Sequence, residues 1–181
     1  MKKAYIFFAD GFEEVEAITP VDVLRRAGVD VTTVSITNSL RVRGSHNIEV
    51  TTDTLIVDIK DIEADMLILP GGLPGAENLN SSKELKQMIQ NYFDKGKSIG
   101  AICAAPMVLG EMGILKNRKA TCYPGFEKYL QGADVSTNAV EVSSNIITGQ
   151  GVGAAMKFSL ELVAQLIDKQ MADELAKKMV V

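Results

Sequence analysis

The stretch SIGAICAAP, residues 98–106, decides the fold that this chain is expected to adopt. Its first half, Ser98–Ile102, is an apolar run typical of a buried strand, and it passes directly into Cys103. The small residues Ala101 and Ala105 stand two positions before and two positions after that cysteine, which lets the backbone turn sharply from strand to helix. The stretch therefore predicts a nucleophile elbow, with the Cys103 sulfur lifted out at the carboxyl edge of a parallel sheet.

Short β-rich runs and longer helical stretches alternate on both sides of this elbow, which is typical of βαβ units around a parallel sheet. The predicted strands cover residues 3–9, 29–36, 66–69, 98–102 and 119–123, with a pair at 140–143 and 146–147 and a hairpin over 40–50 attached to the main sheet. The predicted helices cover residues 13–27, 82–95, 154–169 and 172–179, with a short one running from Cys103 toward Met112. The pattern predicts one compact α/β domain over residues 1–181.

The first predicted helix contains a proline. Pro20 either kinks the helix or starts a second piece that Thr19 caps, and Gly28 is placed as the C-terminal stop.

The composition excludes several classes of function. The 181 residues are 46% hydrophobic and 23% charged, and a formal net charge of −4 argues against nucleic-acid and anionic-membrane partners. One histidine and two cysteines can build neither a three-histidine nor a four-cysteine metal site, and they exclude a disulfide scaffold. The apolar run Ala4–Ala9 is too short for a signal-peptide core or a membrane span, so we expect a cytoplasmic protein.

Two glycine-rich segments come directly after predicted strands. In LPGGLPGA, residues 69–76, glycines can aim backbone N–H groups at an oxyanion, although a Pro-Gly sequence also marks an ordinary tight turn. GQGVGA, residues 149–154, matches the dinucleotide fingerprint. The end of the chain, residues 171–181, is helical and supplies no strand with an acidic residue for a ribose. The second segment is therefore interpreted as a turn that lets the last helix pack on the sheet.

Acidic side chains gather just after the first predicted strand, at Asp10, Glu13, Glu14 and Glu16. They suit a helix N-terminus electrostatically, but one of them can also reach Cys103, because the first strand ends at the same sheet edge. Such a carboxyl would have a raised pKa and could stay protonated as a general acid.

The state of the thiol depends on its expected neighbours. A position at a helix N-terminus favours the thiolate of Cys103, whereas the alternative is a buried structural cysteine. His46 falls in the predicted hairpin, where a surface or interface role is favoured over catalysis. A cysteine protease or a glutamine amidotransferase, which needs an imidazole beside the thiol, is disfavoured.

The chain resembles the ThiJ/PfpI superfamily, on the branch of the Parkinson's-disease-associated deglycase DJ-one and its bacterial relatives. The resemblance covers nearly the whole chain and is carried by residues 9–16, 20–28, 67–72, 75–78, 101–106 and 149–158. It implies a flavodoxin-like three-layer sandwich with a mostly parallel sheet, and a homodimer.

The resemblance also implies roles for single residues. Cys103 matches the reactive cysteine and Glu16 the protonated glutamate that hydrogen-bonds it. Gly72 and Ala104, with Gly71 beside them, match the oxyanion-binding and substrate-binding backbone. The residues that match the dimer surface are Asp22, Arg25, Arg26 and, where some relatives have an arginine, His46.

Two departures from the superfamily pattern limit what carries over. Tyr123 stands where several relatives have a histidine near the cysteine, which puts histidine-assisted proton transfer in doubt. Ala104 stands where protease-like relatives have a histidine, which weakens a peptidase function. The role of Cys122 has no assignment.

These residues support two functions. The first is a cofactor-free and metal-free enzyme on small reactive carbonyls or glycated proteins, of glyoxalase or deglycase type, which converts methylglyoxal to lactate through Cys103 and Glu16. The second is an oxidation-sensing stress protein or redox-regulated chaperone, in which Cys103 is oxidised to a sulfinic acid. The residues favour the first.

Overall fold

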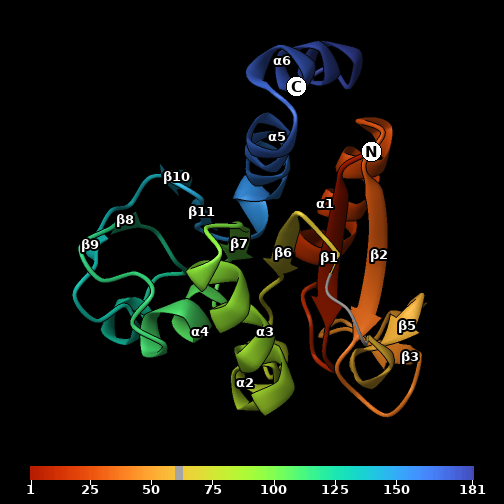
Figure 1. The fold of residues 1–181 in the computed structure, drawn as a ribbon, viewed down its shortest axis with the longest axis vertical. Coiled ribbons are helices and arrows are strands. Elements are labelled where there is room, and N and C mark those ends of the chain that lie inside the picture. The colour runs from red at the N-terminus through yellow and green to blue at the C-terminus, as the bar shows by residue number, and fades with distance from the viewer. Residues whose placement is uncertain (60–62) are drawn as a thin grey trace.

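The computed structural model describes residues 1–59 and 63–181. A curled seven-stranded sheet runs through the molecule in the order β10-β11-β7-β6-β1-β2-β5 (Figure 1). Its strands are β1 (Lys3–Phe8), β2 (Asp30–Ser35), β5 (Thr54–Leu55), β6 (Met66–Leu69), β7 (Ser98–Ile102), β10 (Val140–Ser143) and β11 (Ile146–Gly149). Neighbouring strands are parallel except for the hairpin pair β10 and β11, which confirms a mostly parallel sheet.

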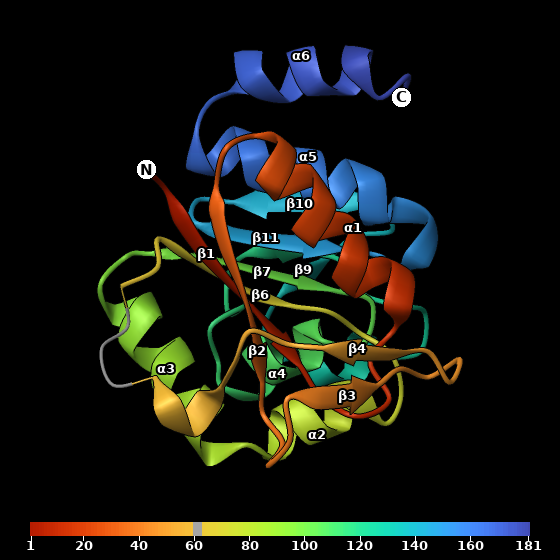
Figure 2. The same ribbon diagram turned by 90° about the vertical axis from the view of Figure 1, so that its right-hand side faces the viewer.

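Helices cover both faces of this sheet and make it the middle layer of three (Figure 2). The first core contains residues of α2 (Gly75–Ser81), α3 (Lys83–Asp94) and α4 (Pro106–Glu111). The second contains residues of α1 (Glu14–Arg26), α5 (Ala155–Leu166) and α6 (Lys169–Lys178). The predicted flavodoxin-like α/β sandwich is confirmed.

The central strands are apolar on both sides because each face of the sheet is covered. In β6, Met66 and Ile68 pack into the core below α1 and α5, while Leu67 and Leu69 pack into the core with α2, α3 and α4. The period-two alternation of a strand thus distributes one continuous apolar run between two cores.

Helix α1 runs without interruption through Pro20, so no second piece begins at Thr19. The helix ends as predicted. Gly28 comes after it with φ +77°, a left-handed conformation that glycine adopts at no steric cost, and its N–H donates to the carbonyl of Arg25. The proline ring removes one helix hydrogen bond without breaking the element, because the helix is held by its buried face.

The predicted hairpin over residues 40–50 exists, but its attachment to the main sheet is wrong. Strands β3 (Arg41–Arg43) and β4 (Glu49–Thr51) form a two-stranded sheet of their own. The hairpin hydrogen-bonds the loop after β1 instead of a strand edge. Gly11 N–H donates to the Arg43 carbonyl at 2.7 Å, and Arg43 N–H donates to Asp10 Oδ1 at 3.0 Å.

Several shorter elements also differ from expectation. The predicted strand over residues 119–123 shrinks to β8 (Lys119–Ala120), which pairs with β9 (Asp134–Val135) outside the main sheet. The last two helices divide earlier than predicted, because Asp168 accepts a hydrogen bond from Met171 N–H and starts α6 at Lys169. Strand β5 and helix α2 were not expected, since neither carries enough residues to show a period.

Of the glycines in residues 149–154, Gly149 has the packing role that the sequence predicts. A Cβ on Gly149 would lie 2.8 Å from the Ile102 side chain and 3.1 Å from Phe158, and one on Gly100 would lie 2.7 Å from Leu162. Gly149 and Gly100 therefore let α5 approach the sheet closely, which gives Gly149 a packing role that needs no dinucleotide.

None of the helices in the described ranges combines the length and apolar character that a bilayer crossing requires.

Candidate active site

Cys103 comes directly after β7 at the carboxyl edge of the sheet, in the sharp turn that the sequence predicts. Its φ of +65° lies in the left-handed region, which costs energy in a residue with a Cβ and is characteristic of functional turns. The backbone is held from both sides: Cys103 N–H donates to the Gly149 carbonyl at 2.9 Å, and Tyr123 N–H donates to the Cys103 carbonyl at 2.8 Å. The placement of Cys103 after β7 is consistent with the nucleophile elbow.

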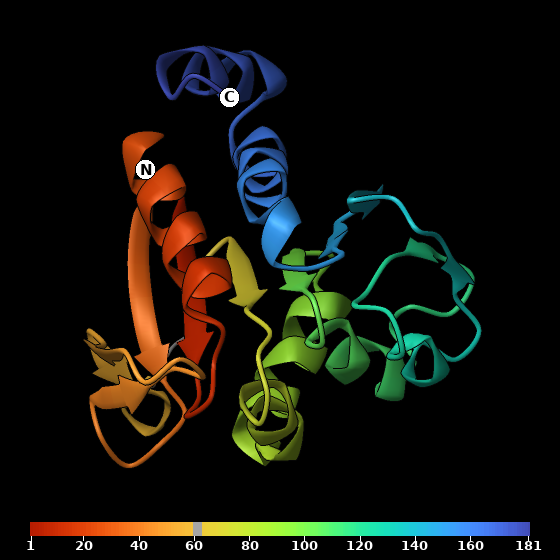
Figure 3. The same ribbon diagram turned by 180° about the vertical axis from the view of Figure 1, so that it is seen from behind.

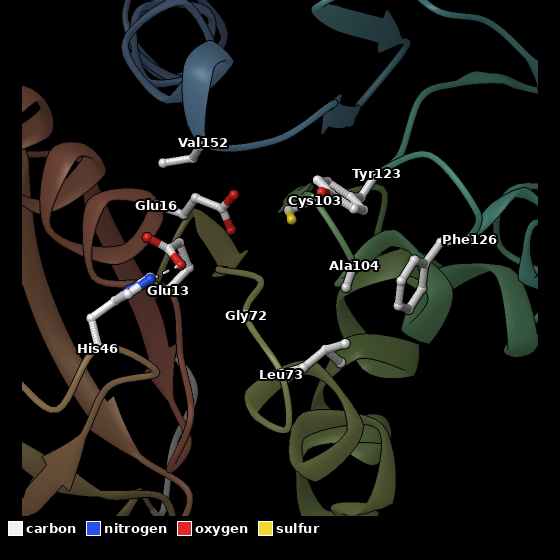
Figure 4. Close-up of a pocket in the computed structure, with 10 residues that line it drawn as sticks. All are labelled: Glu13, Glu16, His46, Gly72, Leu73, Cys103, Ala104, Tyr123, Phe126 and Val152. Carbon is white, nitrogen blue, oxygen red and sulfur yellow. Dashed lines mark ion pairs between the residues drawn. The ribbon is translucent and has the colours of Figure 1, made fainter.

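Glu16 reaches this turn from the first helix, although 87 positions separate the two residues in the sequence (103 − 16). Its side chain is completely buried, and its carboxyl group points toward the sulfur of Cys103 (Figure 4). Oε2 accepts a hydrogen bond from Gly71 N–H at 3.0 Å, whereas Oε1 is buried and has no hydrogen-bond partner among residues 1–59 and 63–181. A buried polar atom without a partner is costly and marks a group held for a purpose other than packing.

Gly71 is the residue that lets these two side chains meet. A Cβ at this position would lie 2.6 Å from the Cβ of Cys103 and 2.6 Å from Oε2 of Glu16, closer than real Cβ contacts. The strand end at residues 69–71 can therefore pass between the carboxyl and the thiol only as glycine.

The ionisation of the pair is governed by burial. Burial raises the pKa of Glu16 to about 7, the charge of Glu13 adds to this rise, and the Cys103 thiol and the Gly71 N–H oppose it. Burial, followed by the charge of Glu16, raises the pKa of the Cys103 thiol to about 12. Two negative charges cannot share so dry a site, so the pair retains at least one proton at neutral pH.

The sequence predicts that a helix N-terminus lowers the pKa of Cys103 and so favours its thiolate. This prediction is wrong, because the pKa is raised. Helix α4 begins only at Pro106, and the thiol pKa rises because desolvation and the neighbouring carboxyl outweigh the favourable backbone dipoles. Protonation of Glu16 would remove its negative charge and thereby favour the thiolate of Cys103.

Two backbone N–H groups face the sulfur. Hydrogen bonds from Ala104 and Gly72 lower the pKa of the Cys103 thiol, although not enough to offset burial. Gly72 has φ +90°, and a Cβ there would collide with the backbone of Phe12 and Glu13. The glycine thus lets the loop after β6 lie close enough to aim its N–H into the site.

A cavity of about 400 Å³ opens above the thiol. Its lining comes from the loops at the carboxyl edge of the sheet, as expected for an open parallel fold. The lining residues, drawn in Figure 4, are Glu13, Glu16, His46, Gly72, Leu73, Cys103, Ala104, Tyr123, Phe126 and Val152.

The cavity corrects the position expected for His46. The side chain is 68% exposed, as a surface residue would be, but it stands at the rim of the same cavity as Cys103. His46 Nδ1 lies 2.9 Å from Glu14 Oε2 and 3.5 Å from Glu13 Oε2. The hydrogen bond with Glu14 and the charge of Glu13 raise the pKa of His46.

Glu13, Glu14 and His46 place their side-chain donor atoms within 4.8 Å of one another, as metal ligands would. Glu14 is already used within the protein, however. It accepts hydrogen bonds from His46 N–H at 2.7 Å and Ser45 Oγ at 3.3 Å. The cluster is therefore explained as the anchor of the β3–β4 hairpin.

Three of the four candidate dimer-surface residues, Asp22, Arg25 and Arg26, do not line the cavity above Cys103. Asp22 and Arg26 form an exposed ion pair of 2.7 Å on α1, and Arg25 donates to the Val31 carbonyl at 3.1 Å. Of that predicted set, only His46 lines the cavity.

The neighbouring residues Tyr123 and Cys122 lie in different surroundings, one half exposed and the other buried. Tyr123 is 49% exposed and lines the cavity. Its phenol ring thus occupies the position at which, by the family resemblance, several relatives have a histidine. Cys122 is 4% exposed, and burial raises its pKa to about 11, with the Glu127 charge adding to the rise. Its thiol is therefore the less reactive choice for chemistry that needs solvent access.

Sequence reasoning did not identify three of the lining residues, which are Leu73, Phe126 and Val152. Glu13 was one of four acidic candidates for a place near Cys103, and it lines the cavity beside Glu16. Leu73 stands directly after Gly72, and this was the one local signal for it. Phe126 and Val152 come from loops whose paths depend on β8, β9 and α5, so no pattern in their own neighbourhoods places them.

Comparison with known proteins agrees with this geometry. The sequence pattern of the DJ-1/PfpI family matches residues 2–165. The chain belongs to the DJ-1/PfpI family.

Individual relatives extend the likeness to the whole chain. Protein DJ-1 homolog B of Arabidopsis thaliana is 42% identical over 99% of this chain, but the match covers 41% of that protein. The chain thus spans about two fifths of the length of this plant relative. Protein dj-1beta of Drosophila melanogaster is 33% identical over 99% of this chain and 97% of its own.

Solved structures of the family share the fold. A structure named "Toxoplasma gondii DJ-1, oxidized" has a TM-score of 0.95 and 35% identity, and the match covers 99% of this chain and 98% of that one. The seven-stranded sheet and the turn after β7 therefore belong to the family's common architecture.

Proposed function

We propose that this protein is a cofactor-independent enzyme that acts on reactive 2-oxoaldehydes or on their adducts with proteins, with Cys103 as nucleophile. The observation that carries the proposal is the buried Glu16 carboxyl beside the thiol. Its Oε1 has no partner in the described part of the chain, and its pKa of about 7 suits proton transfer at neutral pH.

The first step is addition of sulfur to the aldehyde carbon. The Cys103 thiol gives its proton to Glu16 as the C–S bond forms, because a carboxylate near its pKa accepts a proton readily. The aldehyde oxygen gains negative charge, and the N–H groups of Gly72 and Ala104, which face the sulfur, are the donors that would stabilise that charge. Glu16 then returns the proton to this oxygen, which completes a hemithioacetal.

The second step is an isomerisation within the adduct. Glu16 removes the proton from the former aldehyde carbon and delivers a proton to the neighbouring carbonyl carbon through an enediol, which leaves a 2-hydroxy thioester on Cys103. Water hydrolyses the thioester, releases the hydroxy acid and restores the thiol. The net reaction of methylglyoxal and water to lactic acid consumes no external oxidant or reductant.

The direct test compares the wild-type protein with Cys103→Ser and Cys122→Ser on methylglyoxal. We expect lactate formation from the wild type and from Cys122→Ser, and a loss of at least about 100-fold in Cys103→Ser. Equal and near-zero lactate formation in all three proteins would rule out the proposed reaction.

A second candidate function uses the same pocket without turnover. Cys103 would be oxidised by a peroxide to a sulfinic acid, with two peroxide molecules reduced to water, and the protein would act as an oxidation-responsive stress protein or chaperone. The Oε1 of Glu16, when it carries a proton, and the N–H groups of Gly72 and Ala104 favour this function, because each can donate a hydrogen bond to an added oxygen. The name of the Toxoplasma gondii structure describes that protein as oxidized.

Intact-mass analysis after mild peroxide treatment tests this second function. Two added oxygens should map to Cys103, while Cys122 stays unmodified because it is buried. Preferential oxidation of Cys122 would count against a sensing role for Cys103.

A homodimer is part of the proposal. Helix α1 exposes Val15 and Ile18, at 47% and 43%, beside the charged residues Asp22, Arg25 and Arg26. Apolar side chains exposed on a helix that already buries its other face suit association with a second copy.

A further inference from the structure

The cavity above Cys103 has two walls of opposite character. Figure 4 shows the carboxylates of Glu13 and Glu16 and the ring of His46 on one side, and the rings of Tyr123 and Phe126 on the other. Leu73 and Val152 lie at the other two edges of the opening. The reacting thiol therefore sits between a polar wall and an apolar one.

Apolar side chains of this wall and of the two edges are half exposed beside the cavity. Leu73, Tyr123 and Val152 are 49%, 49% and 48% exposed, whereas the apolar residues of the two cores are nearly all buried. Large apolar side chains left half in water beside a nucleophile are available to bind an apolar group of a ligand.

The two aromatic rings of this wall are held in place. Tyr123 and Phe126 form an edge-to-face pair with ring centroids 6.5 Å apart, and Phe126 also packs against Tyr129 at 5.6 Å. The Tyr123 ring lies against Gly151, where a Cβ would approach to 3.3 Å. The wall is thus a preformed surface for a flat group.

The charge of the cavity restricts the ligand further. No lysine or arginine lines it within the residues that the structure describes, and its one basic side chain, His46, is paired with Glu14. Glu13 contributes an acidic group at the rim. An anionic substituent would meet repulsion here without a cation to offset it.

The cavity is also large for methylglyoxal. Its volume of about 400 Å³ falls within the range of pockets that hold molecules of many more atoms. A small aldehyde such as methylglyoxal, bound at the thiol, would leave the apolar wall in contact with water.

We propose that the cavity selects uncharged 2-oxoaldehydes with a flat apolar substituent, such as an aryl ring, which binds against Tyr123, Phe126 and Leu73 while the aldehyde carbon reaches Cys103. This inference rests on the proposed carbonyl chemistry and names the substrate class of that site. Tyr123 and Phe126 are its specificity-determining residues, and Glu13 disfavours anionic substrates.

The test measures kcat/KM for methylglyoxal, phenylglyoxal and 4-carboxyphenylglyoxal. We expect the wild type to prefer phenylglyoxal to methylglyoxal by at least about 10-fold, since the ring buries apolar surface. The ratio should fall about 2- to 10-fold in Tyr123→Ala and in Phe126→Ala, and it should be kept in Tyr123→Phe, which retains the ring. Because each variant is compared with the wild type on the same substrates, the intrinsic reactivity of the aldehydes cancels.

A matched control and a charged substrate sharpen the comparison. Val142→Ala removes an apolar side chain that is 45% exposed on β10, outside the cavity, and should leave the ratio unchanged. The carboxylated substrate should be disfavoured by at least about 5-fold against phenylglyoxal, and Glu13→Gln should reduce that penalty. Equal ratios in the wild type, Tyr123→Ala and Phe126→Ala would overturn the inference.

Binding of an unreactive analogue separates the inference from the proposed function. Acetophenone keeps the aryl ketone but lacks the aldehyde, so its affinity can be measured by chemical-shift titration without turnover. Weaker binding to Tyr123→Ala and Phe126→Ala than to Val142→Ala supports the apolar wall even if no aldehyde is converted. Lactate formation from methylglyoxal with no aromatic dependence in either assay would leave the proposed function standing and refute the inference.

Discussion

At the scale of single residues, the site depends on the carboxyl of Glu16, which is buried near the start of α1. A glutamate in such a place has a raised pKa because its charged form loses the solvation of water. Since this is the group proposed to move protons, the pH dependence of activity and of stability should both report on it.

The first prediction concerns activity in Glu16→Gln. We expect a loss of at least about 100-fold in kcat, because general acid–base catalysis contributes about that much. For the wild type we expect kcat/KM to rise through about pH 7, and the variant should lack this rise. The measurement is a pH profile of lactate formation. An unchanged inflection near pH 7 in the variant would assign the titration to another group.

The same group determines a stability profile. The pKa of Glu16 is 4.5 when exposed and about 7 in the folded protein, so the folded state becomes less stable as pH rises between these values. The loss is on the order of 3 kcal/mol and is complete above about pH 7. Urea unfolding at pH 4.5 and pH 8 should show this loss in the wild type and a smaller one in Glu16→Gln.

A third residue-scale prediction concerns the space between Glu16 and Cys103. Gly71→Ala should separate the two side chains, destabilise the fold by about 1–3 kcal/mol and lower activity strongly, because the new Cβ overlaps both. Gly153→Ala is the matched control, since a Cβ there meets nothing within 4 Å. Thermal unfolding and lactate formation measure the two effects, and equal behaviour of the two variants would contradict the prediction.

At the scale of elements, one buried side chain adds to the backbone hydrogen bonds that hold the β3–β4 hairpin to the loop after β1. Figure 3 shows the hairpin beside the start of α1, where the Glu14 carboxyl accepts hydrogen bonds from His46 N–H and Ile48 N–H. Burial raises the pKa of Glu14, but the hydrogen bonds from His46 and from backbone groups outweigh it, so its pKa is lowered.

Glu14→Gln should therefore loosen the hairpin. We expect faster hydrogen exchange at the His46 and Ile48 amides and a loss of about 1–2 kcal/mol, because bonds to a charged acceptor are replaced by bonds to a neutral one. A lowered pKa stabilises the fold above the ordinary value of 4.5, and this stabilisation is lost as the pH falls through the folded-state pKa, so the wild type should show the same loosening as the pH is lowered below 4.5. Glu77→Gln, a change at an exposed glutamate of α2, is the control. Unchanged exchange in Glu14→Gln would assign the anchor to the backbone alone.

At the scale of the whole molecule, the helices leave unequal faces in contact with solvent. Helix α5 packs between α1 and α6, whereas the outer side of α1 keeps Val15 and Ile18 exposed. A surface of this kind on an early helix supports the proposed homodimer.

Ile18→Glu should convert a dimer into monomers, because an isologous interface places the introduced charge in both copies. Sedimentation velocity is the measurement, with Val142→Glu as a control at a similarly exposed position on β10. A wild-type protein that sediments as a monomer would remove the proposal, and a dimer that survives Ile18→Glu would place the interface elsewhere.

The amount that could be predicted differs from one part of the chain to the next. Strands β1, β6 and β7 are continuous apolar runs ended by turn residues, and helix α3 has a serine cap, so their local patterns suffice. Strands β5 and β9 have two residues each and exist only because a neighbouring strand pairs with them. Patterns that short carry no period to recognise.

The sequence by itself determined the α/β class, the elbow at Cys103 and, with the family resemblance, the choice of Glu16, because each is written in a local run of small, apolar or acidic residues. Only the tertiary structure decided that the thiol pKa rises, that His46 reaches the rim of the pocket and that Tyr123 and Phe126 form one wall. The physical reason is that desolvation and charge–charge contact depend on which distant loops meet at the edge of the sheet. No local pattern specifies that meeting.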